Sequence, residues 1–151
     1  MIDSLIKQVQ VFYPQNLNYF EDKYLQSQEY LFLKKTIVNN RNQVMIELFR
    51  LELKDVLRNY TIKDTTYFYD DNPCIRYDLI SNNNFYQLFI SLLYPVFTVS
   101  ENFSEMAVKI RLNDYSYVPI KELIKINVDN ISANSKKIGE TTLFDCYFHN
   151  N

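Results

Sequence analysis

The chain has 151 residues and a formal net charge of −2, from 16 basic and 18 acidic side chains. A hydrophobic fraction of 47% is typical of a globular chain, and this length fits one domain, so residues 1–151 are interpreted as a single domain. The charge balance provides no basic field for phosphates and argues against nucleic acid as a partner.

Glycine usage argues against nucleotide chemistry. Gly139 is the one glycine of the chain, whereas phosphate-binding loops and dinucleotide turns need several. The G-x-S-x-G elbow of many hydrolases does not occur either. The sequence shows no signal peptide and no apolar run of about 18 residues, which predicts a cytoplasmic protein without a membrane partner.

The first predicted element is a helix over residues 2–13, whose apolar side chains recur at helical spacing. Asp3 or Ser4 is expected to cap it, and Pro14 to end it. Residues 15–23 are polar and are predicted to form a loop, which the rings of Tyr19 and Phe20 pin to the core.

Residues 27–60 form the longest amphipathic stretch, with Ser27 as the expected cap. Asn39 and Asn40 leave open whether it holds one helix or two. The predicted buried face carries Met45, Phe49, Leu53, Val56 and Tyr60, and the predicted wet face carries Glu47, Arg50, Lys54 and Arg58.

After residue 60 the apolar period changes from 3.6 to 2, which favours strands. Strands are predicted over 65–69, 74–80, 85–93, 96–100, 106–112 and 143–148, with turns at 70–73 and 82–84. The strand over 85–93 is expected to be central, and Phe144, Cys146 and Phe148 are expected to point inward from the last strand. Residues 120–126 fit either a helix or a strand. Helices first and strands afterwards predict an α+β fold, with N-terminal helices on an antiparallel sheet of about five or six strands.

Catalytic and metal-binding groups are sparse. Cys146 and His149 have the spacing of half a zinc site, but Cys74 is the one remaining cysteine and there is no second histidine. His149 also stands two residues from the chain end, a poor anchor for a nucleophile's base. We therefore expect no metal, no cofactor and no enzymatic activity. Both thiols are expected to be reduced and buried, although their pairing stays open without geometry.

The first predicted hairpin concentrates acidic and tyrosine side chains between Asp64 and Asp78. The simplest interpretation is a solvated turn. The functional one is an acidic, tyrosine-rich rim that meets a basic protein partner. The candidate partner-binding residues are Tyr67, Tyr69, Asp70, Asp71 and Asp78. Because a turn tip is exposed, Asp70→Lys with Asp71→Lys is expected to leave the melting temperature nearly unchanged. The wet face of the long amphipathic stretch is the alternative contact surface.

The opening of the chain contains a characteristic series of residues: Phe12-Tyr13-Pro14, Asn16-Leu17, Tyr24, Ser27, Glu29-Tyr30 and Leu33. Over roughly the first quarter of the chain, this resembles small cytoplasmic immunity proteins encoded beside polymorphic or type VI secreted toxins of Bacteroidetes-type bacteria. The resemblance implies a non-enzymatic protein that neutralises one cognate protein toxin by binding it. The alternative is a small-molecule binder or a simple acid–base enzyme with a pocket in a curved sheet, which a deep pocket with a buried carboxylate would favour. The sequence leaves the oligomeric state open.

Overall fold

The computed structural model describes residues 1–41, 45–100 and 114–148, and the side chains of residues 45–50 lie outside that description. The helices are α1 (Ile2–Phe12), α2 (Asp22–Leu25), α3 (Gln28–Arg41), α4 (Met45–Val56), α6 (Ile120–Lys125) and α7 (Leu143–Tyr147). The strands are β1 (Thr61–Asp64), β2 (Cys74–Ser81), β3 (Asn84–Ser91), β4 (Val96–Val99) and β5 (Ser116–Tyr117).

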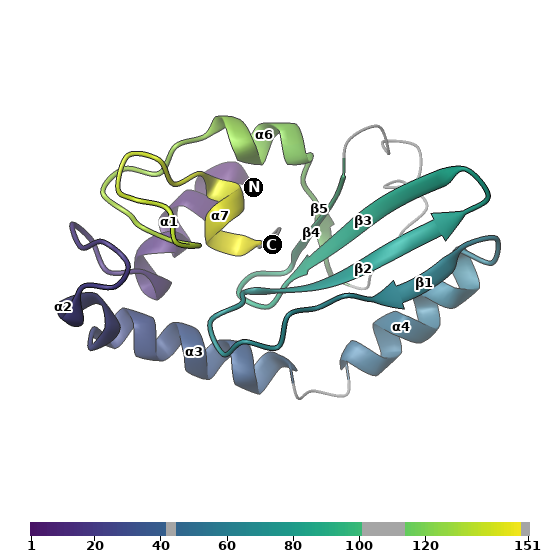
Figure 1. Cartoon of the computed structure of the whole chain (residues 1–151), viewed down its shortest axis with the longest axis horizontal. Helices are drawn as coiled ribbons and strands as arrows, with labels where there is room; N and C mark the ends of the chain where they lie inside the picture. The colour runs from purple at the N-terminus through teal and green to yellow at the C-terminus, as the bar shows by residue number, and fades with distance from the viewer. Residues whose placement is uncertain (42–44, 101–113, 149–151) are drawn as a thin grey trace.

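The strands form one sheet in the order β1-β2-β3-β4-β5. The first three pairings are antiparallel, and β5 joins β4 in parallel. In Figure 1 the helices α1, α6 and α7 gather at one end of the molecule, and β1, β2 and β3 extend toward the other. The predicted α+β class is confirmed, with five strands in the described part of the chain.

The central hairpin matches its sequence pattern. Strands β2 and β3 pair from Cys74 opposite Ser91 to Ser81 opposite Asn84, and the turn lies at 82–83. On β2 the alternation buries Ile75, Tyr77 and Leu79, as predicted. Strand β3 is central, as predicted. Its side chains at 88–91 are all buried, whereas those at 84–87 are exposed or half-buried.

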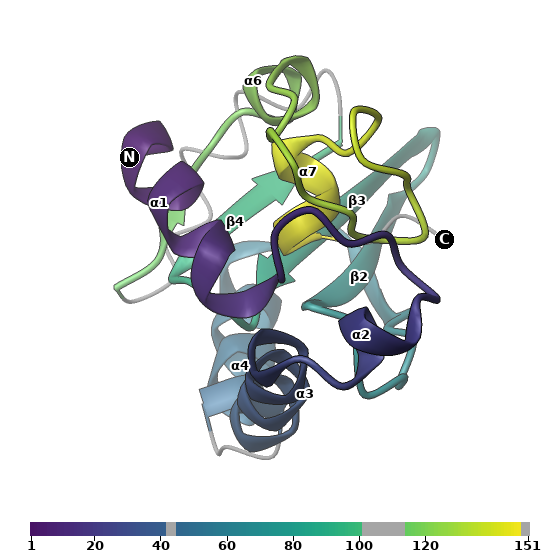
Figure 2. The same ribbon diagram turned by 90° about the vertical axis from the view of Figure 1, so that its left-hand side faces the viewer.

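The N-terminal helices build the core at the other end. Helix α1 buries Leu5 and Val9 and contacts α3 and α7, which Figure 2 shows from the helical end. Ser27 Oγ accepts a 3.2 Å bond from the amide of Tyr30 and caps α3 as predicted. The predicted cap at Asp3 or Ser4 is wrong, because α1 begins at Ile2 and places both residues inside its first turn.

The long amphipathic stretch contains two helices, because α3 ends at Arg41 and α4 begins at Met45. Leu53 and Leu57 are buried, whereas Val56 is 44% exposed, so the inward face of α4 is rotated from the predicted one. Lys54 and Arg58 are exposed as expected. Met45 and Phe49, like Glu47 and Arg50, lie outside the described side chains, and the predicted strand 106–112 lies outside the described residues.

Two predicted strands are wrong. Residues 65–69 form a loop, and β1 ends before them at Asp64 opposite Tyr77. Residues 143–148 hold helix α7, because Thr142 and Asp145 form a reciprocal capping box at its start. The ambiguous segment after Pro119 is the helix α6, with Pro119 as its N-cap. Cys74 and Cys146 are free and buried, as expected, although Cys146 lies on a helix.

Candidate functional site

The loop between β1 and β2 displays three consecutive aromatic side chains. Tyr67 is 40% exposed, Phe68 70% and Tyr69 68%. The rings of Tyr67 and Tyr69 stack with their centroids 6.4 Å apart and their planes 15° apart. We call residues 67–71 the aromatic loop. Exposed rings at this density are typical of protein contact surfaces rather than of ordinary turns.

The backbone of the aromatic loop is fixed by side chains beneath it. Arg41, at the end of α3, donates through Nη2 to the carbonyl oxygens of Tyr69 (2.8 Å) and Asn72 (3.2 Å). The buried Asn72 donates through Nδ2 to the carbonyl oxygen of Tyr67 at 2.6 Å. These bonds satisfy the carbonyls of a segment without ladder partners, so its course is defined without strand pairing.

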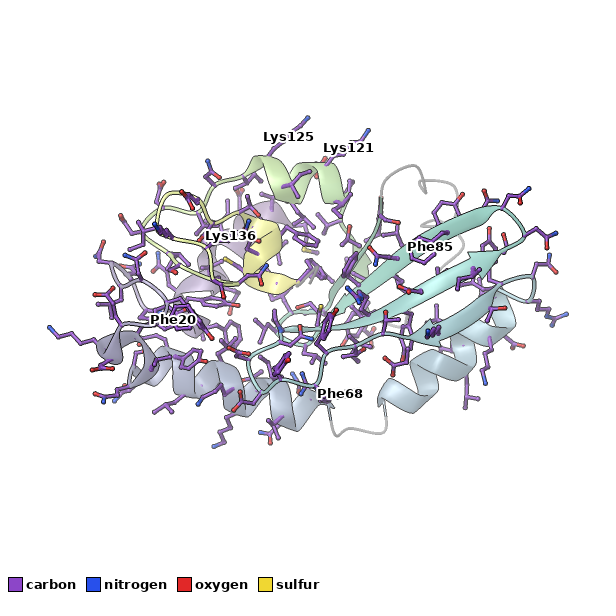
Figure 3. The ribbon with its side chains drawn as sticks, viewed as in Figure 1. Phe20, Phe68, Phe85, Lys121, Lys125 and Lys136 are labelled. Carbon is purple, nitrogen blue, oxygen red and sulfur yellow. The ribbon has the colours of Figure 1, made fainter. Side chains whose placement is uncertain are left out.

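Two guanidinium groups support the rings. The Cζ atom of Arg76 lies 5.0 Å from the Tyr67 ring centroid, and that of Arg41 lies 5.5 Å from the Phe68 centroid. Figure 3 shows Phe68 close to the end of α3. Cation–π contacts of this kind hold the two rings in place.

Asp71 anchors the loop to the helical end of the molecule. Its Oδ2 accepts hydrogen bonds from the hydroxyl groups of Tyr19 (3.0 Å) and Tyr30 (3.1 Å). Burial, followed by the charge of Asp71, raises the pKa of both tyrosines, so both hydroxyls stay protonated donors. One carboxylate thus joins the aromatic loop, α3 and the loop that follows α1.

A small hollow lies beside this carboxylate. Its volume is about 20 Å³, which is room for a single water. It is lined by Tyr13, Tyr19, Tyr24, Tyr30, Leu33, Asp71, Asn134 and Ser135. A carboxylate therefore borders a cavity here, but the cavity is too small for an organic substrate.

The predicted site residues divide into three groups. Tyr67, Tyr69 and Asp70 lie together on the exposed loop. Asp71 belongs to the same loop but turns inward, so the premise that both aspartates are free in solvent is wrong. Asp78 lies on β2, within the predicted strand 74–80, and its Oδ1 accepts a hydrogen bond from the hydroxyl of Thr65 at 3.2 Å.

Sequence reasoning missed three residues of this region. Phe68 and Arg41 were not candidates, because Phe68 was predicted to lie in a strand and Arg41 lies within the amphipathic stretch 27–60, with no predicted contact to residues 67–71. The rings of Tyr19 and Phe20 were both expected to pin their loop to the core, yet Phe20 is 72% exposed, and of the two rings only that of Tyr19 packs against the core. Side-chain periodicity carries no signal for a ring displayed from an irregular loop.

A metal-binding cluster and a membrane-spanning helix are both absent from the part of the chain that the structure describes. Residues 1–41, 45–100 and 114–148 contain no group of three His, Cys, Asp or Glu side chains placed to hold a metal ion, and His149 lies outside them. None of the described helices combines the length and apolar character needed to cross a membrane.

Comparisons with known proteins gave no family model, curated protein or solved structure that matches this chain.

Proposed function

We propose that this chain is a non-enzymatic protein-binding module, a cytoplasmic immunity protein that neutralises a cognate toxin by binding it. The observation that carries the proposal is the aromatic loop, in which Tyr67, Phe68 and Tyr69 are exposed on an anchored backbone. The resemblance of the first quarter of the chain to immunity proteins supplies the identity of the partner.

Anchoring favours binding. A protein interface depends on a few large side chains, with tyrosine among the most frequent. A loop that is already ordered loses less conformational entropy on association than a free one. The contacts from Arg41, Asn72 and Asp71 hold the loop in one form before any partner arrives.

The charge of this surface indicates a basic partner. Asp64 and Asp70 are exposed on either side of the three rings. Thr66 donates its backbone amide to Asp64 Oδ1 at 3.0 Å, which fixes the position of that carboxylate. Carboxylates beside aromatic groups suit the basic cleft of a toxin that acts on nucleic acid, and they raise the association rate more than the final affinity.

The test is co-expression and pull-down with the protein encoded by the neighbouring gene, together with rescue of growth when that protein is expressed alone. The wild-type chain should form a stable complex and restore growth. Phe68→Ala with Tyr69→Ala should weaken binding by roughly 30-fold or more, because hot-spot truncations cost about 2 kcal/mol or more.

Phe85→Ala is the matched control, because Phe85 is 58% exposed and lies away from the aromatic loop near the tip of the β2–β3 hairpin (Figure 3). Its affinity should equal that of the wild type. No complex at micromolar concentration and no rescue would overturn the function. Equal losses from Phe85→Ala and the loop variant would overturn the site.

The exposed face of α4 is the alternative contact surface. Charge reversal at Lys54 and Arg58 should leave affinity unchanged, whereas Asp70→Lys should weaken it by an amount that shrinks as salt rises. The opposite result would place the contact on α4. The small-molecule alternative has weaker support, because it requires a deep pocket with a buried carboxylate, and the cavity that borders Asp71 has a volume of about 20 Å³.

A further inference from the structure

A second surface feature lies between the loop that follows α1 and the loop that precedes α7. Here the described residues form an open hollow of about 450 Å³. It is lined by Asn18, Tyr19, Phe20, Ser132, Ser135, Lys136 and Lys137. We call it the Phe20 hollow. Its two walls come from segments that are far apart in the sequence, and no sequence pattern predicted that they would lie side by side.

The two walls of the Phe20 hollow are fastened to each other. The amide of Tyr19 donates to Ser132 Oγ at 2.9 Å, and the amide of Ile138 donates to Asn18 Oδ1 at 2.9 Å. The buried hydroxyl of Tyr24 adds a 2.6 Å bond to the carbonyl oxygen of Ser132. Because side chains and backbone bond across the gap, the shape of the hollow is set before anything binds.

Phe20 is held out in an unfavourable backbone conformation. Its φ is 77°, a region that bulky residues rarely adopt and that Asn or Gly enters more easily. Its ring packs edge-on against the ring of Tyr19, with the two ring centroids 4.2 Å apart, yet the side chain remains 72% exposed. Asn134 and Ser135, in the opposite loop, also have positive φ values of 54° and 59°. A strained bulky residue, as at Phe20, is typical of a segment that presents a group for binding.

The charge of the Phe20 hollow is opposite to that of the aromatic loop. Lys136 and Lys137 are both exposed, and they are the charged residues among the described side chains that line it. The acids nearest in sequence to Phe20 and to the two lysines are Glu21, whose carboxylate accepts a hydrogen bond from the amide of Asn18, and the exposed Glu140. Tyr19 belongs to this hollow and also donates to Asp71, so it links the hollow to the aromatic loop.

We propose that the Phe20 hollow is a second protein contact site, which takes a segment of the partner that carries a carboxylate beside an apolar side chain. The inference rests on the proposed function in taking a protein as the partner, but it assigns a different site with the opposite charge preference. The carboxylate meets Lys136 and Lys137, and the apolar group packs on the exposed ring of Phe20. Together with the acidic aromatic loop, this arrangement admits a partner of mixed charge in one orientation.

Peptide titration tests the site without any toxin. The ¹⁵N-labelled full chain is titrated at low salt with the peptide Glu-Glu-Phe-Glu-Glu and, separately, with Lys-Lys-Phe-Lys-Lys, both with blocked ends. The acidic peptide should shift the amides of residues 18–20 and 132–138. The basic peptide should leave them in place. Shifts that spread evenly over all exposed lysines, or that centre on α6, would overturn the proposal.

Two charge-reversal pairs give the matched comparison. Lys136→Glu with Lys137→Glu should remove the shifts caused by the acidic peptide. Lys121→Glu with Lys125→Glu changes the same charge on α6, which Figure 3 shows apart from Lys136, and should leave them unchanged. Equal effects from both pairs would reduce the site to non-specific attraction and overturn it.

Phe20→Asn separates recognition from folding. Asparagine accepts the positive φ more readily, so the melting temperature should hold or rise while peptide shifts are lost. With the neighbour-encoded toxin, the same variant should bind roughly tenfold more weakly. If the toxin binds Phe20→Asn and the lysine pair at wild-type strength, the hollow is not a contact site and the proposed function stands. If the acidic peptide docks in the hollow but the toxin never binds, the site stands and the proposed function fails.

Discussion

Two segments of this chain have similar composition, but one is exposed and the other is buried. Residues 65–71 read Thr-Thr-Tyr-Phe-Tyr-Asp-Asp, and residues 141–148 read Thr-Thr-Leu-Phe-Asp-Cys-Tyr-Phe. The first displays its rings to solvent, whereas the second buries every side chain from 143 to 148. Strands were predicted over 65–69 and 143–148, and neither segment forms one. Aromatic content therefore fixes neither the backbone conformation nor the burial of a segment.

The position of the carboxylate explains the difference. Asp145 stands three residues after Thr142, so the two form a capping box and start a helix that packs into the core. In the first segment, the residue three positions after Thr66 is Tyr69, which has no carboxylate to complete a capping box. The hydroxyl oxygen of Thr66 instead accepts a hydrogen bond from the backbone amide of Arg76 at 2.9 Å. Asp71, further along, binds Tyr19 and Tyr30 and pins an irregular loop.

The largest expected difference in the free energy of unfolding comes from removing one aromatic ring from each of the two segments. Phe144 is 6% exposed and packs on Phe89 and Phe148, with both ring centroids 5.5 Å away. Phe144→Ala should therefore lower the free energy of unfolding by about 3–5 kcal/mol. Phe68→Ala should change it by less than about 0.5 kcal/mol, because the ring is 70% exposed. Urea denaturation measures both.

Phe144→Leu keeps the comparison measurable if the alanine variant does not fold, and it should give an intermediate loss. Similar losses for the variants at Phe144 and Phe68 would contradict the assignment of one ring to the core and the other to the surface.

The sequence was informative where one signal acted alone. The alternation on β2 and the cap at Ser27 each had a local cause, and both were predicted correctly. The strand prediction for residues 65–69 was wrong because β propensity reflects the packing of side chains against neighbouring strands, and the rings of this loop have few such neighbours. The roles of Asp71 and Phe20 depend on contacts between distant segments, such as Tyr19 with Ser132, which no local pattern encodes. The capping box at Thr142, by contrast, is present in the sequence as Thr-x-x-Asp, but the strand prediction rested on alternation alone.

Adjacent aspartates offer a second test. Asp71→Ala leaves the hydroxyls of Tyr19 and Tyr30 without their acceptor, which should cost about 1–3 kcal/mol of unfolding free energy. Asp70→Ala, at an exposed position, should cost less than about 0.5 kcal/mol. Thermal denaturation of the two single variants gives the contrast. A neutral Asp71→Ala would mean that the loop is held without this carboxylate.

Buried tyrosines should make the core sensitive to alkali. Burial raises the pKa of Tyr147, and its hydroxyl donates to the carbonyl oxygen of Leu5 at 2.5 Å. The folded chain therefore keeps this proton above pH 10, whereas the unfolded chain, with a pKa of about 10, loses it. The unfolded state then binds fewer protons, so stability is fully present below pH 10 and falls as pH rises above it, by about 1.4 kcal/mol per pH unit for each such group.

Tyr147→Phe should reduce that slope by the contribution of one proton, measured by denaturation between pH 8 and 11 (a range of about 3 units around the unfolded pKa). Tyr13 and Tyr24 provide matched variants, because burial raises both pKa values and both hydroxyls donate to backbone carbonyls at 2.6 Å. An unchanged slope in Tyr147→Phe would show that this hydroxyl ionises equally in both states.

The smallest effect tests what makes the second segment a helix. Thr142→Ala removes the oxygen that accepts from the amide of Asp145 at 3.3 Å, and it should cost about 1 kcal/mol. Thr142→Ser keeps an oxygen and should cost less. On an Asp145→Ala background, Thr142→Ala should cost less than on the wild type, because the box has already lost one partner. Equal costs on both backgrounds would mean that Thr142 and Asp145 act independently rather than as a capping box, and the position of the carboxylate would then no longer explain why this segment folds inward while the aromatic loop does not.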